Sequence, residues 1–348
     1  MNLIIQEDAQ AIANSDLYWD KLNGKTVLIS GANGYVPSYF VHAFIARNDM
    51  YNEKIKVIAL CRNEKKAEVR FSEYLERDDF KLLIQDVCEP IVLNEEVHFF
   101  IHAASPAGVR ISNIDPVATF YANVLGCKQM LELSKKNKTE GFLLLSSIDV
   151  YGKPETKRRF IESDNFMLDS LNPRNVYACA KRAAESLCTC YYVQYKTPVI
   201  IARPSQIMGP GIALDDGRLH ADFISQMLTR DTIILKSDGT AVRTFIYITD
   251  AVIGMLVALT KGVYGEAYNV ADENGELSVF GIAQLMASLE TEKKVDVVFD
   301  YEKRNAPEVT HALSVVTADA GKLRLLGWQP KYIPKETAER TLRYFRNI

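Results

Sequence analysis

The chain has 348 residues, of which 48% are hydrophobic and 24% charged, the balance of a globular protein with one large domain or two closely associated ones. Its net charge of −3 excludes the basic surface that nucleic-acid binding requires, and no apolar run approaches the roughly 20 residues that span a bilayer. Acidic residues but no basic one precede Lys21, which is unlike a signal peptide. The six cysteines form no Cys-x-x-Cys pair and the five histidines show no ligand spacing. We therefore expect a cytoplasmic protein with reduced thiols, no metal site, and neither nucleic acid nor membrane as partner.

Strand and helix patterns alternate along the first 204 residues. Continuous apolar strands separated by helices are typical of a parallel sheet covered on both faces, and right-handed crossovers make it a doubly wound Rossmann sheet. The expected strands are Thr26–Ser30, Lys56–Leu60, Lys81–Ile84, His98–Ala103, Phe142–Ser146 and Val199–Arg203. The expected helices are Tyr39–Ala46, Glu64–Glu76, Pro116–Lys136, with Asp115 as its N-cap, and Arg174–Tyr195.

After Pro204 the alternation becomes irregular, which predicts a smaller, interleaved C-terminal α/β domain for substrate. The apolar segment Ala251–Leu259 is expected to return to the main core. We therefore divide the chain into a dinucleotide-binding domain over 1–204, joined by 241–262, and a substrate-binding domain over 205–240 and 263–348.

A glycine turn, Gly31-Ala32-Asn33-Gly34, lies between the first strand and the first helix. Glycines let the backbone approach a pyrophosphate, and a helix N-terminus offers it free N–H groups. Pro37 stands where a third glycine is common, and the first turn of a helix tolerates proline. The turn predicts a dinucleotide site, the alternative being a purely structural turn. Its expected ligands are Gly31, Asn33, Gly34, Tyr35 and Val36.

The second strand ends without the acidic residue that holds the ribose 2′-hydroxyl of NAD. Cys61 and Arg62 stand there instead. A guanidinium suits a 2′-phosphate, so Arg62 slightly favours NADP over NAD, unless it is simply solvated. Asp86, after the third strand, can accept a hydrogen bond from the adenine amino group, and we assign its neighbour Val87 to the same site.

A serine, a tyrosine and a lysine form the expected catalytic group. Ser147 follows a strand, and Tyr177 and Lys181 share a helix face because they are four residues apart. A nearby ammonium favours the phenolate, so Lys181 and a bound nicotinamide cation are expected to lower the pKa of Tyr177 and make it a base. Ser147 would hydrogen-bond the substrate oxygen while hydride goes to the cofactor.

With these groups in place, the sequence resembles the extended short-chain dehydrogenase/reductases, the NAD(P)-dependent epimerases and dehydratases of nucleotide sugars. The resemblance covers nearly all of the chain after Lys21. The motifs on which the resemblance rests are T-V-L-I-S-G-A-N-G-Y-V, H-A-A-S-P-A, L-L-L-S-S-I-D-V-Y-G, Y-A-C-A-K-R, A-R-P-S-Q-I-M-G-P-G and G-T-A-V-R-T-F-I-Y-I-T-D-A. H-A-A-S-P-A and the D-G-R at 216–218 are most similar to UDP-glucuronate decarboxylases.

The resemblance assigns further roles by position. Ser147, Tyr177 and Lys181 match the catalytic triad. Asn123 matches the asparagine that supports the active-site strand, and it is assigned to the cofactor site with Ala103, Ala104, Tyr177 and Lys181. The substrate site is expected to contain Arg243, which matches the arginine on the diphosphate, together with Arg218, Ser105 and Gln206, the last in place of the usual asparagine.

Asp149 occupies the place of an acidic group that dehydratases and decarboxylases use beside the reacting sugar carbons. A carboxylate there can remove a proton next to a keto group, whereas 4-epimerases usually carry an uncharged residue. Ile148 replaces the polar neighbour found in both subgroups. The alternative for Asp149 is a helix cap or a surface charge.

The resemblance implies oxidation at C4 of a nucleotide-diphosphate sugar to a 4-keto intermediate, as in epimerases and dehydratases. The alternatives are an NADPH-dependent reductase of a nucleotide 4-keto-6-deoxy sugar, a UDP-glucuronate decarboxylase-like enzyme, and, in a different class, an NADP-sensing scaffold without catalysis. The family's dimers use the helices that begin at Pro116 and Arg174, so a homodimer is expected.

Overall fold

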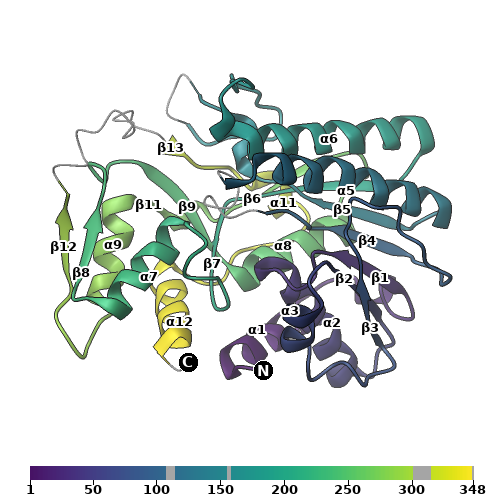
Figure 1. Cartoon of the computed structure of the whole chain (residues 1–348), viewed down its shortest axis with the longest axis horizontal. Coiled ribbons are helices and arrows are strands. Elements are labelled where there is room, and N and C mark those ends of the chain that lie inside the picture. The colour runs from purple at the N-terminus through teal and green to yellow at the C-terminus, as the bar shows by residue number, and fades with distance from the viewer. Residues whose placement is uncertain (107–113, 155–157, 301–314, 347–348) are drawn as a thin grey trace.

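The computed structural model describes residues 1–106, 114–154, 158–300 and 315–346. Its largest element is a seven-stranded, fully parallel sheet, which confirms the predicted doubly wound α/β fold (Figure 1). The strand order β3-β2-β1-β4-β5-β6-β10 reverses direction between β1 and β4, where open sheets of this kind bind ligands at the carboxyl ends of the strands. The strands are β3 (Phe80–Ile84), β2 (Lys56–Cys61), β1 (Thr26–Ser30), β4 (Phe99–His102), β5 (Gly141–Leu145), β6 (Val199–Pro204) and β10 (Ala267–Val270).

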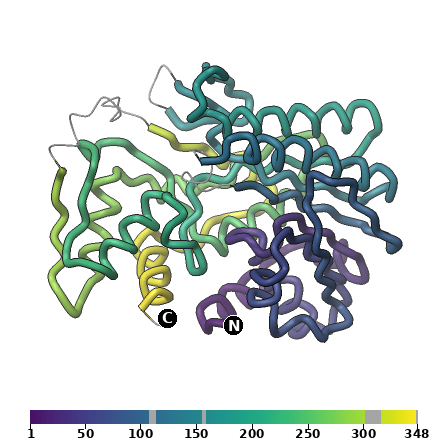
Figure 2. The backbone as a smooth tube through the Cα atoms, in the orientation of Figure 1, coloured from purple at the N-terminus to yellow at the C-terminus, as the bar shows by residue number. Residues whose placement is uncertain are grey.

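Alternate residues of each strand enter two separate cores. Val27 and Ile29 pack on one face of the sheet with α1, α2 and α8, whereas Leu28 packs on the other face with α5 and α6. Because successive strand side chains point to opposite faces, a strand covered on both sides is apolar throughout. Figure 2 follows the chain through these layers. The covering helices are α1 (Leu3–Ala13), α2 (Tyr35–Tyr51), α3 (Glu64–Arg70), α5 (Pro116–Asn137), α6 (Val176–Tyr195) and α8 (Ile248–Lys261), with a short 3₁₀ turn at Trp19–Lys21.

Two of the predicted helices show how far local signals reach. The N-cap of α5 is confirmed, since Asp115 Oδ1 accepts the N–H of Ala118 at 3.0 Å and Pro116 opens the helix. The helix predicted over 64–76 ends instead at Arg70. Phe71 and Tyr74 turn inward to pack on one another and on Phe80, and this tertiary contact overrides the helical pattern.

The smaller part of the molecule packs α7, α9 and α12 around a core of its own. Central strand β9 pairs with β7, β11 and β13, and β8 pairs in parallel with β12. Its elements are β7 (Gln206–Met208), α7 (Leu219–Thr229), β8 (Thr232–Leu235), β9 (Val242–Tyr247), β11 (Glu276–Ser278), α9 (Val279–Ser288), β12 (Asp296–Phe299), β13 (Val315–Val316) and α12 (Pro334–Arg346), with a 3₁₀ turn at Glu273–Gly275. The short helix α11 (Gly321–Arg324) packs instead against β10 and α8, and 3₁₀ turns at Ile148–Tyr151 and Pro173–Asn175 pack against α6.

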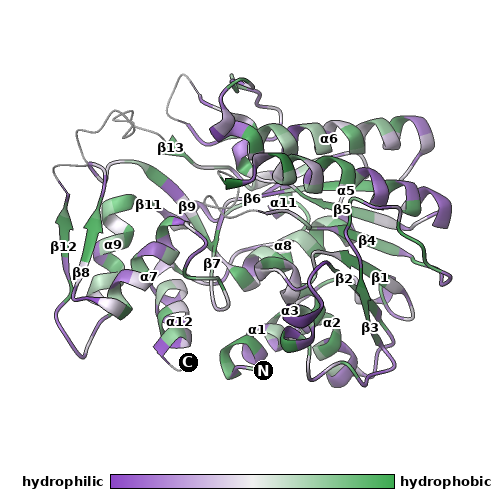
Figure 3. Ribbon diagram, in the orientation of Figure 1, coloured by the Kyte–Doolittle hydropathy of each residue, from purple (hydrophilic) through white to green (hydrophobic). Residues whose placement is uncertain are grey.

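The two parts exchange segments. The hydrophobic helix α8 packs against β5, β6 and β10 of the large sheet, and β10 is the edge strand of that sheet (Figure 3). Strand β9, by contrast, pairs only with strands of the smaller part among the described residues. We expected residues 241–262 to join the large domain and residues 263–348 to belong to the substrate domain. The strand pairing differs at two places: β9, within 241–262, pairs in the smaller part, and β10, within 263–348, pairs in the large sheet. The division into domains itself remains a prediction.

Candidate active site

The glycine turn has the geometry that a dinucleotide pyrophosphate needs. Gly31 has φ +66°, and a Cβ there would lie 2.7 Å from Cα of Ala104. Gly34 is the N-cap of α2, so the N–H groups of Tyr35 and Val36 in the first turn have no acceptor within the helix. Pro37 is the third residue of α2, where its missing N–H costs the helix nothing. The cradle and the free helix N-terminus fit a pyrophosphate group.

Ser30 connects this turn to the loop after β4. Its Oγ accepts the N–H groups of Ala103 at 3.1 Å and Ala104 at 3.2 Å, and it is 2.8 Å from Nδ1 of His102. Burial lowers the pKa of His102 to about 3, so the ring stays neutral. Sequence reasoning missed Ser30 and His102, although a polar residue closing each of two apolar strands was a visible signal. Ala103 and Ala104 thus lie beside the turn, as the predicted cofactor site requires.

The residues at the end of β2 divide into one buried and one exposed. Cys61 lies beneath the glycine turn, and burial raises its pKa to about 11, while backbone groups of Asn33 and Ala32 oppose the rise. The Arg62 side chain is 74% exposed and forms an ion pair at 3.8 Å with Asp86. Oδ1 of Asp86 accepts the N–H of Cys88 at 2.9 Å. The Arg62 guanidinium is therefore accessible at the end of β2, with the Asp86 carboxylate beside it.

Ser147 and Asp149 come from the short 3₁₀ turn that follows β5. Ser147 is its N-cap: Oγ accepts the N–H of Asp149 at 3.1 Å and donates to Asp149 Oδ2 at 3.2 Å. This network fixes both side chains at the carboxyl edge of the sheet. The predicted alternative of a cap therefore applies to Ser147, not to Asp149.

Asp149 lies close to Ser147, Arg243 and Arg218. Its surface is accessible to solvent, yet the surrounding protein is dense enough that burial raises its pKa. Hydrogen bonding by Ser147 and the charges of Arg243 and Arg218 oppose that rise. Ile148, by contrast, is 3% exposed and packs with Tyr151 in a small apolar cluster. The position that is polar in related subgroups thus supplies no acid or base here.

Tyr177 and Lys181 lie one turn apart near the start of α6. Lys181 is 2% exposed, its Nζ lies 5.7 Å from the centre of the Tyr177 ring, and it donates to the carbonyl oxygen of Leu145 at 2.5 Å. Burial lowers the pKa of Lys181 to about 8. The helix pattern therefore brings the pair together beside the end of β5, as predicted.

The expectation that Lys181 lowers the pKa of Tyr177 does not hold for the chain by itself. Burial raises the pKa of Tyr177 to about 12, and the Asp149 carboxylate adds to the rise. The groups that oppose it are the Arg218 guanidinium and a side-chain hydrogen bond with Ser147. Desolvation disfavours the charged phenolate more strongly than any cation in the chain favours it.

Two arginines of the smaller part lie near Asp149. Arg243, on β9, acts electrostatically on Asp149, and its own pKa is lowered by burial. Arg218 precedes α7, its Nε lies 3.2 Å from Asp216 Oδ1, and its charge reaches both Tyr177 and Asp149. The structure therefore brings together the predicted catalytic group and two predicted substrate residues from distant parts of the sequence.

The amides predicted for the site differ in their surroundings. Asn123, on α5, donates to Ser105 Oγ at 2.9 Å and to the carbonyl oxygen of Thr119 at 2.8 Å. Its Oδ1 has no partner among the described residues, and neither has the buried Oε1 of Gln206 on β7. Asn123 thus fixes the segment after β4, whereas Gln206 keeps hydrogen-bonding capacity unused.

A buried ion pair between Arg203 and Glu185, which the sequence analysis did not predict, supports the site. Arg203 donates to Glu185 at 2.7 Å and to Tyr151 at 3.1 Å. Ser146 Oγ donates to Glu185 at 2.5 Å. These contacts tie α6 to β6 and to the 3₁₀ turn of Ser147. Nothing local marked Glu185 and Arg203 as partners, because they come from different elements.

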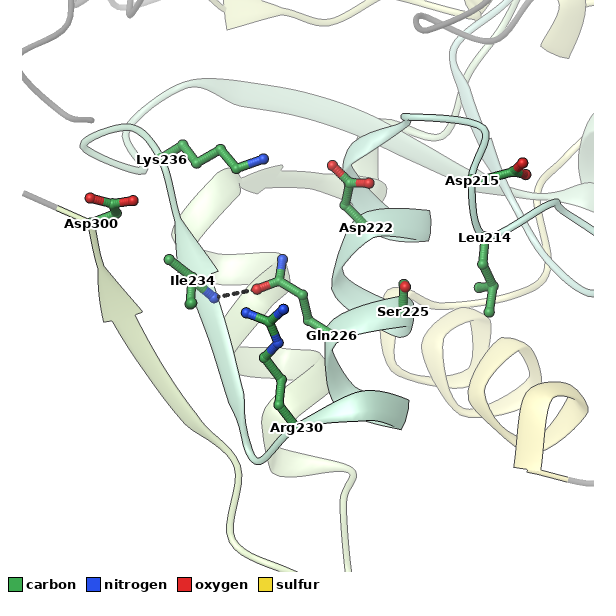
Figure 4. A pocket seen from close by; sticks show the side chains of 9 residues that line it. All are labelled: Leu214, Asp215, Asp222, Ser225, Gln226, Arg230, Ile234, Lys236 and Asp300. Carbon is green, nitrogen blue, oxygen red and sulfur yellow. Dashed lines mark hydrogen bonds between the residues drawn. The ribbon is translucent and has the colours of Figure 1, made fainter. Parts of the chain in front are cut away.

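A cavity of about 470 Å³ opens beside the loop that carries Arg218. Figure 4 shows side chains of α7 and β8 around it, with Gln226 accepting the N–H of Ile234 at 2.8 Å. Its lining residues are Leu214, Asp215, Asp222, Ser225, Gln226, Arg230, Ile234, Lys236 and Asp300.

Comparison with known proteins decides the family. Residues 27–271 match the model of the NAD dependent epimerase/dehydratase family. The chain belongs to this family. Among curated relatives of this epimerase/dehydratase, UDP-glucuronic acid decarboxylase 5 of Arabidopsis thaliana is 30% identical over 88% of the chain and 84% of the relative. The dTDP-D-glucose 4,6-dehydratase of Homo sapiens is 27% identical over 92% and 90%.

Solved structures agree on the fold of this family member. The UDP-glucose 4-epimerase of Thermotoga maritima has a TM-score of 0.79 at 22% identity, over 92% of this chain and 99% of that one. The dTDP-glucose 4,6-dehydratase of Bacillus anthracis, in complex with NAD, has a TM-score of 0.76 at 22% identity, over 93% and 97%. The family match confirms the predicted class, an NAD(P)-dependent enzyme on a Rossmann fold. No helix of the described residues has the length and apolarity to cross a membrane.

Proposed function

We propose that this enzyme oxidises C4 of a nucleoside-diphosphate sugar to a 4-keto intermediate with a bound nicotinamide dinucleotide. The observation that carries the proposal is that Ser147, Asp149 and Tyr177 lie together, with the two cations Arg218 and Arg243 close to them. Oxidation of a hydroxyl needs a group that removes its proton, and binding of a diphosphate needs cations. A nucleoside-diphosphate sugar therefore requires both kinds of group close together.

Tyr177 is the base for the C4 hydroxyl in this scheme, and Ser147 hydrogen-bonds the same oxygen. The bound cofactor accepts the hydride, and its oxidised nicotinamide ring brings a positive charge. The chain needs such a charge, because burial, with the Asp149 carboxylate adding to it, raises the pKa of Tyr177 to about 12. Lys181, held on Leu145, keeps a second positive charge beside the phenol ring.

Arg243 and Arg218 bind the diphosphate, since a planar guanidinium matches phosphate oxygens with two parallel hydrogen bonds. The nucleoside then extends away from Tyr177 into the cavity between α7 and β8. Ile234 supplies an apolar surface there for a base, and Lys236 and Asp222 point toward the same space (Figure 4).

Asp149 acts after the ketone has formed. A proton next to a keto group is acidified, and Asp149 is a carboxylate close to Tyr177. Dehydration in its usual form also needs an acid at position 148, where Ile148 lies in an apolar cluster. A UDP-glucuronate decarboxylase-like reaction is the second candidate, favoured by Arabidopsis relatives of that activity at 30% identity.

The test is incubation of purified enzyme with UDP-, dTDP-, GDP- and CDP-sugars, with absorbance at 340 nm and mass spectrometry of the products. Product without net cofactor turnover supports the proposal, and its mass separates the reactions: unchanged for an epimerase, lighter by water for a dehydratase, and lighter by carbon dioxide for a decarboxylase. Net NADPH consumption would instead identify the 4-keto sugar reductase and overturn the proposal.

We also propose a homodimer in the cytoplasm. An exposed apolar face on α5 supports the dimer: Val117 is 57% exposed, Tyr121 50% and Leu125 39%. Exposed apolar residues repeating along one helix face are typical of a protein interface.

The cysteines support the cytoplasm as the compartment. All six are free thiols in the structure, and a reducing compartment keeps thiols in that form.

A further inference from the structure

Tyr35 spans two parts of the site. It is the first residue of α2 and belongs to the glycine turn. Its side chain reaches the loop that leads to Arg218, because a Cβ built on Gly209 would lie 3.2 Å from the Tyr35 hydroxyl. Tyr39, one turn later, donates to the carbonyl oxygen of Pro210 at 3.1 Å. The start of α2 is thus packed directly against the loop over 209–218.

Two buried polar atoms in this contact have no hydrogen-bond partner among the described residues. One is the Tyr35 hydroxyl, a donor, and the other is Asp216 Oδ1, an acceptor. Asp216 Oδ1 lies 3.2 Å from Arg218 Nε, but this ion pair lacks hydrogen-bond alignment. Buried polar groups without partners are rare in folded proteins, and each costs stability until it is paired.

The two atoms are within electrostatic reach of one another. Burial raises the pKa of Tyr35, the Arg218 guanidinium opposes the rise, and the carboxylates of Asp8 and Asp216 add to it. A hydroxyl donor and a carboxylate acceptor are complementary, so a loop position that brings the two atoms together would satisfy both.

We propose that Tyr35 is a positioning residue: its hydroxyl donates to Asp216 when substrate binds, and Asp216 thereby holds Arg218 in place for the diphosphate. The inference rests on the proposed function, in which Arg218 binds that group. It adds a direct link from the cofactor turn to the substrate loop through one side chain.

The link has a thermodynamic consequence. The dinucleotide binds the backbone of the turn and so fixes Tyr35. Fixing Tyr35 favours the loop position in which Asp216 is paired, so cofactor and nucleotide each strengthen binding of the other by the same factor. Without the Tyr35 hydroxyl, that mutual effect is lost.

The test compares wild type with Tyr35→Phe, which keeps the ring and the backbone N–H. Tyr51→Phe is the matched control, because Tyr51 lies at the other end of α2 with an exposed hydroxyl bonded to Asn14. Calorimetry measures UDP binding with and without saturating NAD or NADP, whichever wild type binds more tightly. Thermal unfolding of the ligand-free proteins is measured alongside.

We expect Tyr35→Phe to weaken UDP binding about tenfold in the presence of cofactor, the range for a hydrogen bond to a charged group. Cofactor affinity measured without UDP is unchanged, and cofactor and UDP no longer strengthen each other's binding. The ligand-free variant unfolds at the same temperature as wild type or higher, because it loses an unpaired buried hydroxyl. A merely structural role would instead lower the unfolding temperature. Tyr51→Phe behaves as wild type.

The partner is tested by repeating the comparison in an Asp216→Ala background, which removes the acceptor, and there Tyr35→Phe is expected to have little further effect. UDP binding by Tyr35→Phe equal to wild type, or an undiminished loss in the Asp216→Ala background, would overturn the inference and leave the proposed function intact. Failure of wild type to bind UDP, dTDP, GDP or CDP would overturn both.

Discussion

The Nζ of Lys181 lies 5.7 Å from the centre of the Tyr177 ring and donates its hydrogen bond to the backbone of Leu145. The lysine is thus anchored to the end of β5, immediately before the segment that carries Ser147. Tyr177 and Ser147 approach one another because this contact, together with the Glu185–Arg203 ion pair, fixes α6 against the sheet. The packing of α6 on the sheet therefore determines how far the Tyr177 phenol lies from the Ser147 hydroxyl.

Tyr177→Phe tests the proposed base. We expect turnover to fall by about 10²–10⁴-fold, the contribution of a positioned acid or base, with cofactor affinity unchanged. The measurement is single-turnover reduction of the cofactor at 340 nm with the best sugar of the panel. Tyr195→Phe, at the exposed end of the same helix, is the matched control and should keep full activity. Unchanged turnover by Tyr177→Phe would show that Tyr177 is not the base, whereas the cofactor-sensing scaffold predicts no turnover by wild type with any sugar of the panel.

Lys181 makes the stability of the cofactor-free protein depend on pH. Burial lowers its pKa from 10.5 to about 8, so between these values the folded chain binds fewer protons than the unfolded chain, and the free energy of unfolding rises with pH. In Lys181→Met this contribution is absent. The free energy of unfolding of wild type minus that of the variant should therefore rise by at most about 3 kcal/mol from pH 7 to pH 10.5. Denaturant titrations at each pH measure it, and a flat difference would contradict the burial of a charged lysine.

Asp149→Asn separates oxidation of the sugar from the step that follows. We expect overall turnover to fall about 10²–10⁴-fold while reduced cofactor accumulates, because the ketone forms but cannot react further. Burial raises the pKa of Asp149, and the reactive carboxylate appears only above that raised value. Wild-type kcat should therefore fall on the acidic side of the pH profile, and the variant should lack that limb. Normal turnover by the variant would assign Asp149 a structural role.

Arg62→Ala tests the preference for the second cofactor phosphate. We expect NADP binding to weaken about tenfold, since one charge-assisted hydrogen bond to phosphate is lost, and NAD binding to change little. Fluorescence titration with each dinucleotide measures both affinities. Equal effects on NAD and NADP would show that Arg62 is simply solvated, as its 74% exposure and its ion pair with Asp86 allow.

The proposed dimer depends on the apolar face of α5. Replacing Tyr121 and Leu125 together with glutamate should convert the dimer to a monomer, because two buried like charges on each subunit would meet across the interface. Light scattering at micromolar concentration measures the mass. Val69→Glu is the control, since Val69 is 79% exposed on α3. A wild-type monomer would overturn the prediction.

The sequence by itself was enough for the parallel sheet and its main strands. Continuous apolar runs such as Thr26–Ser30 are dictated by burial on both faces, and caps such as Asp115 act within a few residues. The helix predicted over 64–76 failed where Phe71 and Tyr74 pack on distant Phe80, because a contact across the sequence has no local signal.

The residues of the site divide in the same way, into features that the sequence predicts and features that only the tertiary structure decides. The sequence determined the glycine turn and the pairing of Tyr177 with Lys181, since a strand–helix junction and a helical repeat are local geometry. Only the tertiary structure decided that Arg218 and Arg243 face Asp149, and that Ile148 is buried among apolar side chains. It also decided the pKa of Tyr177, because desolvation depends on everything packed around the phenol, and no spacing in the sequence encodes that density.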